Sequence, residues 1–299
     1  MPLRRYKNRR SVGWTKKRSS YRRKASYVKR RSTTKRRPMT KRKILNFTST
    51  KKKDNMVVWS NQTTSGYAGS NTYAVQPATL IGGNTYIFPW VATARQYAAG
   101  THASPIQESS RTKSLCYMKG LKENIQIQTN SAASWQWRRI CFTMKGDELY
   151  SQTATNIAWS VLSTQGMVRV VNGIGGTTVG SNFVDLVFDG QNGTDWLNIF
   201  TAKTDNQRIS VKYDKTRVFN SGGTPGIMRN FKLWHPMNKN LRYDDEENGA
   251  NETEAAYSSD GKQGMGDYYV VDIFSSGSNT TSADNLVFVP EATLYWHEK

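Results

Sequence analysis

Short runs of apolar and β-branched residues, separated by clusters of Gly, Asn, Ser and Thr, dominate the chain after residue 54. Leu115–Thr129 alternates most clearly, with Ile125 and Ile127 on one side of an extended chain and Gln126 and Gln128 on the other. Alternation with a period of two is typical of a strand that buries one face. The other segments predicted as strands are Asn55–Ser60, Thr85–Val91, Trp135–Met144, Met167–Val171, Phe183–Phe188, Arg208–Phe219, Asn230–Trp234, Tyr268–Phe274 and Leu286–Trp296.

One short helix is predicted at Thr194–Lys203, because Thr194 can cap it and Trp196, Ile199 and Phe200 share one helical face. Strands with so little helix predict an all-β fold, a single jelly-roll sandwich with about eight strands in two sheets. Two long connections, 62–114 and 244–266, carry few strand signals. Loops of this length in a compact domain are usually functional or mobile.

The charge of the chain is concentrated at one end. The sequence has 43 Lys and Arg against 22 Asp and Glu, and 23 of the basic residues but none of the acidic ones lie in residues 1–53. The remaining 246 residues are therefore slightly acidic. This distribution predicts two parts: a disordered basic arm (residues 1–53) and a folded shell domain (residues 54–299).

The basic arm predicts a polyanionic partner, because Lys and Arg neutralise phosphates and release condensed counterions. Tyr6, Trp14, Tyr21 and Tyr27 lie between its cationic clusters, and aromatic rings stack on the unpaired bases of single strands. The alternative is a solvated tail that only improves solubility. The predicted nucleic-acid-binding residues are Arg4, Arg5, Arg9, Arg10, Trp14, Lys16, Lys17, Arg18, Tyr21, Arg22, Arg23, Lys24, Tyr27, Lys29, Arg30, Arg31, Lys35, Arg36, Arg37, Lys41, Arg42 and Lys43.

Residues 35–43 also have the pattern of a nuclear-import signal, which Lys51–Lys53 could extend. The same residues could simply bind more phosphate, and both uses could apply at different stages. A mitochondrial transit peptide is a rival interpretation, but residues 1–43 contain a single Leu and no Ile or Phe to build its apolar face. No apolar run is long enough to span a bilayer, so we expect no membrane partner.

Five cations of the body lie on predicted strands near aromatic residues: Arg138, Arg139, Lys212, Lys215 and Arg217. One interpretation is that they line the inner wall of a shell and bind the genome. The other is that they are ordinary solvent-facing residues or form ion pairs between subunits. The pattern alone leaves both interpretations open.

Neither a metal site, a cofactor nor an enzyme activity is expected. Cys116 and Cys141 have no histidine partner at the spacing of zinc ligands, and buried packing is the better interpretation of both. The acidic cluster at 244–247 could hold a divalent cation, although a mobile outer loop is the stronger interpretation. The phosphate-binding, zinc-protease and serine-hydrolase motifs are absent from the sequence.

Several segments, in order along the chain, resemble the capsid proteins of genomoviruses, small circular single-stranded DNA viruses related to the geminiviruses. They are the Arg-, Lys-, Ser- and Tyr-rich arm, LCYMKGLKENIQIQT at 115–129, WRRICFTMKG at 137–146 and VKYDKTRVF at 211–219. The resemblance implies a single jelly-roll subunit, an inward-facing arm that contacts the genome, and a small icosahedral shell of about sixty copies.

The sequence therefore predicts a viral capsid protein that assembles into an icosahedral shell and packages single-stranded DNA through its arm. Its expected partners are the single-stranded DNA genome, other copies of itself and host nuclear-import receptors. Its expected locations are the virion and, during assembly, the host nucleus. The alternative is a non-viral nucleic-acid-binding protein with an all-β domain.

Overall fold

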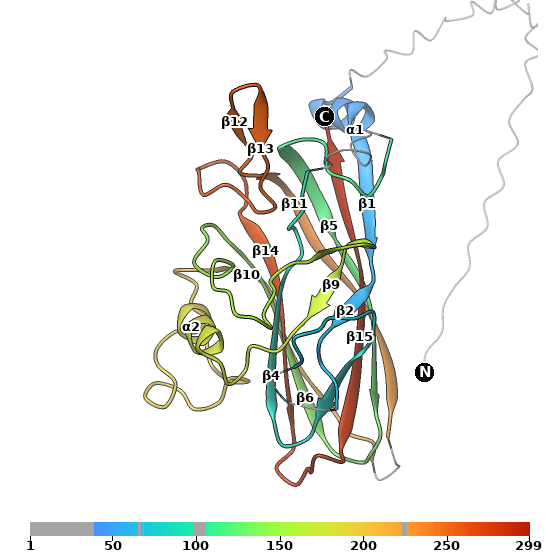
Figure 1. Cartoon of the computed structure of the whole chain (residues 1–299), viewed down its shortest axis with the longest axis vertical. Helices are drawn as coiled ribbons and strands as arrows, with labels where there is room; N and C mark the ends of the chain where they lie inside the picture. Colours follow the sequence, from blue (N-terminus) through green and yellow to red (C-terminus); the bar gives the residue numbers. More distant parts are fainter. Residues whose placement is uncertain (1–38, 65–66, 68, 98–105, 223–225) are drawn as a thin grey trace, which may run out of the picture.

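The computed structural model describes residues 39–64, 67, 69–97, 106–222 and 226–299, and these form an all-β domain, as predicted (Figure 1). Two antiparallel sheets lie face to face. The first, the outer sheet, has the strand order β1 (Thr50–Met56), β15 (Asn285–Glu298), β5 (Leu115–Thr129), β11 (Met228–Arg242), with β3 (Ala78–Ile81) also paired to β15. The second, the inner sheet, has the order β10 (Ser210–Phe219), β6 (Trp135–Met144), β14 (Asp267–Ser276), β4 (Thr85–Val91).

Three pairs of short strands and two helices complete the described part of the structure. The short strand pairs are β2 (Val58–Ser60) with β9 (Arg169–Val171), β7 (Leu162–Ser163) with β8 (Gly166–Met167), and β12 (Glu246–Asn248) with β13 (Asn251–Thr253). The helices are α1 (Lys41–Thr48) and α2 (Thr178–Val187). Among the described residues, neither helix is long or apolar enough to cross a membrane. Helix α1 and the β12–β13 hairpin lie at the same end of the sandwich as the C-terminus (Figure 1).

The two sheets have different hydrophobic patterns because their surroundings differ. In β5 buried and exposed residues alternate, since only one face of the outer sheet packs on the core. In β6 and β14 nearly every residue is buried. The far side of the inner sheet is covered by α2, whose Phe183 packs with Phe142 and Tyr269 in one hydrophobic cluster. The outer sheet is therefore the one that leaves a broad face free.

Two local predictions between residues 178 and 203 were wrong. The segment predicted as the strand Phe183–Phe188 belongs to helix α2, which Thr177 caps by accepting a hydrogen bond from the Gly180 backbone N–H. The predicted helix at Thr194–Lys203 is instead a series of turns. There the Asp195 and Asn198 side chains accept hydrogen bonds from nearby backbone N–H groups, which competes with helix formation.

The folded domain begins before the boundary predicted between residues 53 and 54. Strand β1 starts at Thr50 and pairs with β15, so Lys51 and Lys53 face solvent while Lys52 points into the domain. Lys52 is 3% exposed, its amine donates to two backbone carbonyls, and it lies 3.7 Å from the Glu298 carboxylate. The alternation of an edge strand is hidden in the sequence because all three positions are lysine.

This boundary gives a test of stability. Replacement of Lys52 by methionine leaves the buried Glu298 carboxylate without its cation, which costs about 2 kcal/mol or more. The melting temperature should fall by at least about 4 °C for a domain of this size. The matched control is Lys51→Met, whose exposed side chain should leave the melting temperature within about 1 °C. Equal melting temperatures for the two variants would contradict the structural role of Lys52.

A network of four buried charges joins the two sheets. Glu123 on β5 forms ion pairs with Arg139 on β6 and Arg169 on β9, and both arginines also pair with Asp272 on β14. All four side chains are fully buried. Two positive and two negative charges leave the network neutral, which is the condition under which buried charges are tolerated.

Candidate nucleic-acid interface

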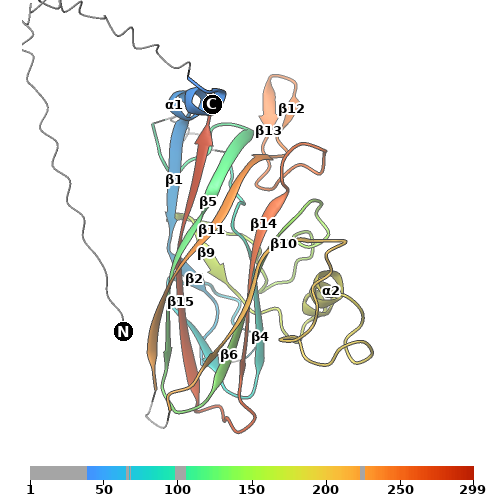
Figure 2. The same ribbon diagram turned by 180° about the vertical axis from the view of Figure 1, so that it is seen from behind.

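The predicted binding residues of the basic arm divide into two groups. Those from Arg4 to Arg37 lie outside the described residues. Lys41, Arg42 and Lys43 fall in helix α1, whose first turn is capped by Thr40, and the Lys41 and Lys43 side chains are exposed. Helix α1, which carries these cations, lies at one end of the outer sheet (Figure 2).

Arg138 and Arg139 do not form a nucleic-acid-binding wall, because both side chains are buried inside the domain. Arg139 belongs to the four-charge network. Arg138 pairs with Asp214 at 2.6 Å and donates to the backbone carbonyls of Ile199 and Ala202, which holds the 190–203 turns against the inner sheet. Their positions beside tryptophan in the sequence reflected core packing rather than a surface.

The other three predicted body cations lie on β10, at the edge of the inner sheet. Lys212 and Lys215 are exposed. Burial, together with the nearby Lys239, lowers the pKa of Lys212. Arg217 is half-buried, with its guanidinium 4.9 Å from the Trp137 ring centre, and it donates to the Tyr213 hydroxyl at 2.8 Å. Lys212 and Lys215 thus remain candidates for a phosphate contact, while Arg217 stabilises the core.

A second group of cations, which sequence reasoning missed, shares the free face of the outer sheet. The strand registers place Lys51 beside His297 and Tyr117 in one row, and Lys122 beside Trp234 in another. We call this surface the basic face. Its residues are Lys51, Lys53, Tyr117, Lys119, Lys122, Lys232, Trp234, Arg242, Tyr295 and His297.

The acidic residues of these four strands mostly turn the other way. Asp54, Glu123 and Glu298 all point into the sandwich, where each pairs with a buried cation. Glu291 is the acid that remains on the basic face among the described residues of β1, β5, β11 and β15. The face therefore has six cations against Glu291, and Lys53 is also paired with the exposed Glu108 at 3.5 Å. The positive charge that remains attracts a polyanion.

An aromatic platform lies in the middle of the basic face. Trp234 is 48% exposed, and its ring lies across β5 at Gly120, where a Cβ atom would come within 2.6 Å of the ring. On the far side of β5 the Tyr295 ring lies 5.9 Å from the Trp234 ring. Gly120 is therefore needed for this close approach. Exposed rings of this kind can stack on unpaired bases.

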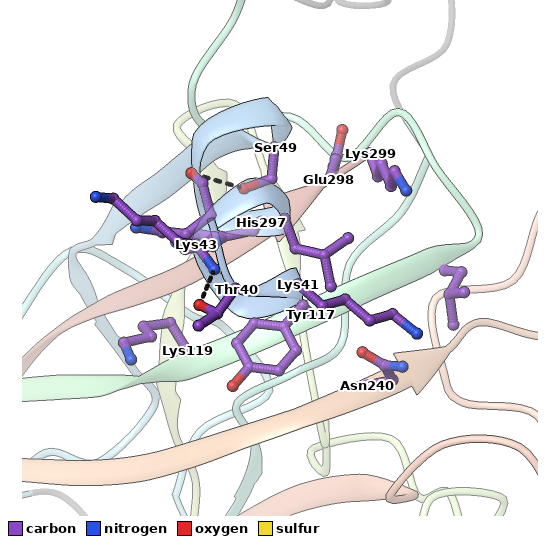
Figure 3. Close-up of a pocket in the computed structure, with 13 residues that line it drawn as sticks. Thr40, Lys41, Lys43, Ser49, Tyr117, Lys119, Asn240, His297, Glu298 and Lys299 are labelled. Atoms are coloured by element: carbon purple, nitrogen blue, oxygen red, sulfur yellow. Dashed lines mark hydrogen bonds between the residues drawn. The ribbon is translucent and has the colours of Figure 1, made fainter. Parts of the chain in front are cut away.

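A cavity of about 890 Å³ lies between helix α1 and the end of the outer sheet (Figure 3). Its floor contains Tyr117 and His297, whose rings are 6.0 Å apart. Burial and the positive charges of Lys51 and Lys119 lower the pKa of His297, which favours the neutral ring. The remaining lining residues are Thr40, Lys41, Lys43, Leu45, Asn46, Ser49, Leu115, Lys119, Asn240, Glu298 and Lys299.

The face and the cavity combine two kinds of chemistry. Lysines and an arginine on a sheet can contact phosphates without reading sequence. Aromatic rings between them can stack on bases, which a duplex keeps inside its own stack. Asn240 and Asn46 add amide groups that can hydrogen-bond to base edges. The arrangement is therefore suited to a single-stranded polynucleotide.

Asp245 of the acidic cluster and the two cysteines have packing roles in this structure. Asp245 pairs with the buried Arg111, and that ion pair lowers the pKa of Asp245 against the effect of its own burial. Within the described part of the chain, no group of three His, Cys, Asp or Glu side chains could hold a metal ion. Cys116 and Cys141 are buried and unpaired with each other, and burial raises the pKa of both thiols.

One signal in the sequence could have located the basic face. The polar positions that alternate with Ile125 and Ile127 include Lys122, and those of the next outer-sheet segment include Lys232. Lys119 lies three residues from Lys122, so strict alternation would place it on the other side, and the irregularity at Gly120 brings it to the solvent face. Only the pairing of strands distant in sequence brings them together.

Neither a known protein family nor a curated protein matches the chain. The geometry and the charge distribution therefore carry the functional proposal.

Proposed function

We propose that this chain is a viral coat protein that assembles into a small icosahedral shell and packages single-stranded DNA. The observation that carries the proposal is the separation of charge: 23 cations and no acid in residues 1–53, followed by 246 slightly acidic residues that form a β sandwich. A tail that binds polyanions and a rigid domain that can build a wall are the two parts that such a protein needs.

We also propose that the sandwich is a jelly roll, and the strand order supports this. Numbered along the chain, the eight long strands are arranged 1-8-3-6 in the outer sheet and 5-4-7-2 in the inner sheet. First pairs with last, second with seventh, third with sixth and fourth with fifth. This is the pairing of one long hairpin rolled up on itself, an architecture used by viral capsid and lectin domains.

Negative-stain microscopy of the purified full-length protein tests the proposal. A coat protein should form closed particles of uniform diameter, whereas a non-viral nucleic-acid-binding protein should remain small on its own. The same preparation on a sizing column should elute as a large assembly. A stable monomer under every condition of salt and added DNA would contradict the shell.

The charge of the arm also predicts the packaged nucleic acid. About sixty arms, each with 23 cations, would bring about 1,400 positive charges inside a shell, each able to offset about one phosphate. Allowing for small counterions, the genome should be single-stranded and on the order of one to three thousand nucleotides. Nucleic acid extracted from particles should be digested by a nuclease specific for single strands. A resistant duplex, or a far longer product, would contradict this function of the arm.

A further inference from the structure

We infer that the cavity between α1 and the outer sheet is a binding site for one nucleotide of single-stranded DNA, with the base on Tyr117 and His297 and the phosphate at the lysines. This inference rests on the proposed function, because it names the place where the folded domain holds the strand that the arm gathers. This cavity brings two aromatic rings and four lysines into one concave site.

The shape of the cavity fits a nucleotide. Its volume, about 890 Å³, lies within the range of sites that enclose small ligands. The Tyr117 ring faces the space beneath the helix, with Lys119 on one side and Lys41 and Asn240 on the other (Figure 3). Leu45 comes from the helix and Leu115 from the sheet, and together they give the cavity apolar walls. An aromatic floor with apolar walls accepts a flat base and excludes a duplex.

The charges of the cavity fit a phosphate. Lys41, Lys43, Lys119 and Lys299 all contribute to its lining. Glu298 is the one acid among the lining residues. Its carboxylate accepts hydrogen bonds from the Trp296 indole N–H and the Thr112 backbone N–H, and it forms an ion pair with Lys52 inside the domain. Lys119 is already held in place by a 2.9 Å hydrogen bond to Asn238. A phosphate entering the cavity therefore meets uncompensated positive charge.

The position of the cavity explains why a DNA strand bound by the arm would enter it next. Its lid is helix α1, the first element after residues 1–38, and its floor continues into the basic face through Lys51 and His297. A strand gathered by the arm would reach this cavity before it reaches the aromatic platform at Trp234 and Tyr295. The cavity, the Lys51 and His297 row and the aromatic platform form one path for a flexible polyanion across the end of the outer sheet.

Two measurements on the full-length protein test the site. Thymidine 5′-monophosphate is titrated and followed by saturation-transfer NMR, and a 12-residue oligothymidylate carrying 5-iododeoxyuridine is photocrosslinked and mapped by mass spectrometry. We expect saturable binding of the monophosphate, weaker binding of thymidine, and crosslinks to the peptide that contains Tyr117. Tyr117→Leu should weaken the monophosphate at least about fivefold, the lower end of the effect of removing a stacking ring, and Tyr117→Phe should retain it.

Controls separate this inference from the proposed function. Lys119→Gln should weaken the monophosphate, whereas Lys203→Gln, an exposed lysine in the turns held against the inner sheet, should not. Each variant must keep the melting temperature of the parent, and Lys119→Gln together with the crosslink map decides the matter if the Leu variant is unstable. If the oligothymidylate binds but its crosslinks avoid Tyr117 and the monophosphate does not saturate, the nucleotide site is wrong and the coat-protein function stands. If the oligothymidylate does not bind, the proposed function fails, and the monophosphate titration still decides the cavity.

Discussion

Replacement of Arg139 by methionine is expected to lower the free energy of unfolding by about 3–5 kcal/mol. The guanidinium is fully buried and contacts both Glu123 and Asp272, so its loss leaves two carboxylates beside the single positive charge of Arg169. A buried negative charge without a partner is the costly outcome. Urea unfolding measures the change, and Lys215→Met on the exposed side of β10 should stay within about 0.5 kcal/mol of the parent.

A double variant sharpens this test. Arg139→Met combined with Glu123→Met removes one charge of each sign and leaves Arg169 paired with Asp272 at 2.7 Å. The double variant should therefore be more stable than Arg139→Met alone, a non-additive result that a purely steric effect of methionine would not give. If both substitutions simply add, charge balance is not what stabilises the network.

The same network predicts how the stability of the domain depends on pH. Burial raises the pKa of Glu123, but Arg139 and the other nearby cations outweigh burial and hold the pKa at about 2. A depressed pKa in the folded state means that the contribution of Glu123 is present above pH 4.5 and disappears as the pH falls toward 2. The stability difference between the parent and Glu123→Gln should shrink over that range. Asp267 is present in both proteins, so the difference between their stabilities does not contain its contribution. This matters because burial raises the pKa of Asp267 to about 6 and its contribution to stability changes with pH in the opposite direction.

Removal of residues 1–38 is expected to weaken binding of single-stranded DNA by at least about a hundredfold at low salt. This deletion removes 17 of the 23 cations of the arm and keeps α1 and all of β1, whereas a chain starting at Asp54 would lose α1 and Thr50–Lys53 of β1. The slope of log K against log salt should decrease by several units, because each phosphate contact on a single strand contributes about 0.7. Fluorescence titration of a labelled oligonucleotide at several salt concentrations measures both quantities.

The truncated protein should keep a weak, salt-sensitive affinity from the basic face. Lys122→Gln combined with Lys232→Gln in the truncated chain should reduce this residual binding, while Lys203→Gln combined with Arg208→Gln serves as the matched pair of exposed cations away from the outer sheet. An unchanged salt slope after deletion would mean that the arm is not the binding element. Loss of all binding would mean that the basic face contributes nothing measurable.

The sequence predicted the long strands well because their signals are local. The bounds of β5 and β6 agree with the predicted segments, since alternation marks one and a run of aromatic and β-branched residues marks the other. The signal failed where a short apolar run fits either structure: VDLVF could be read as a strand, and the cap at Thr177 with Phe183 and Leu186 on one face makes it helical. Residues 51–53 alternate between exposed and buried positions in β1, but the sequence does not reveal this because all three residues are lysine.

The candidate site was harder to predict because it is assembled across the sheet. Lys51, Tyr117 and His297 are far apart in sequence and become neighbours only through the pairing of β1, β15 and β5. Arg138 and Arg139 looked accessible since charged residues are rarely buried, and only their carboxylate partners on other strands make burial possible. Sequence patterns report burial poorly when the compensating charge lies elsewhere in the chain.

The position of β15 also has a consequence for the order of folding. This last strand of the sheet lies between β1 and β5, and it pairs with β5 along nearly its whole length and with β1 over Ala292–Glu298 (Figure 1). A chain emerging from the ribosome therefore has two unpaired strand edges until β15 has been made. Contacts between such distant residues form slowly. The folded domain should consequently complete its fold only after β15 has left the ribosome, and a chain that stops before residue 285 should aggregate rather than form a smaller domain.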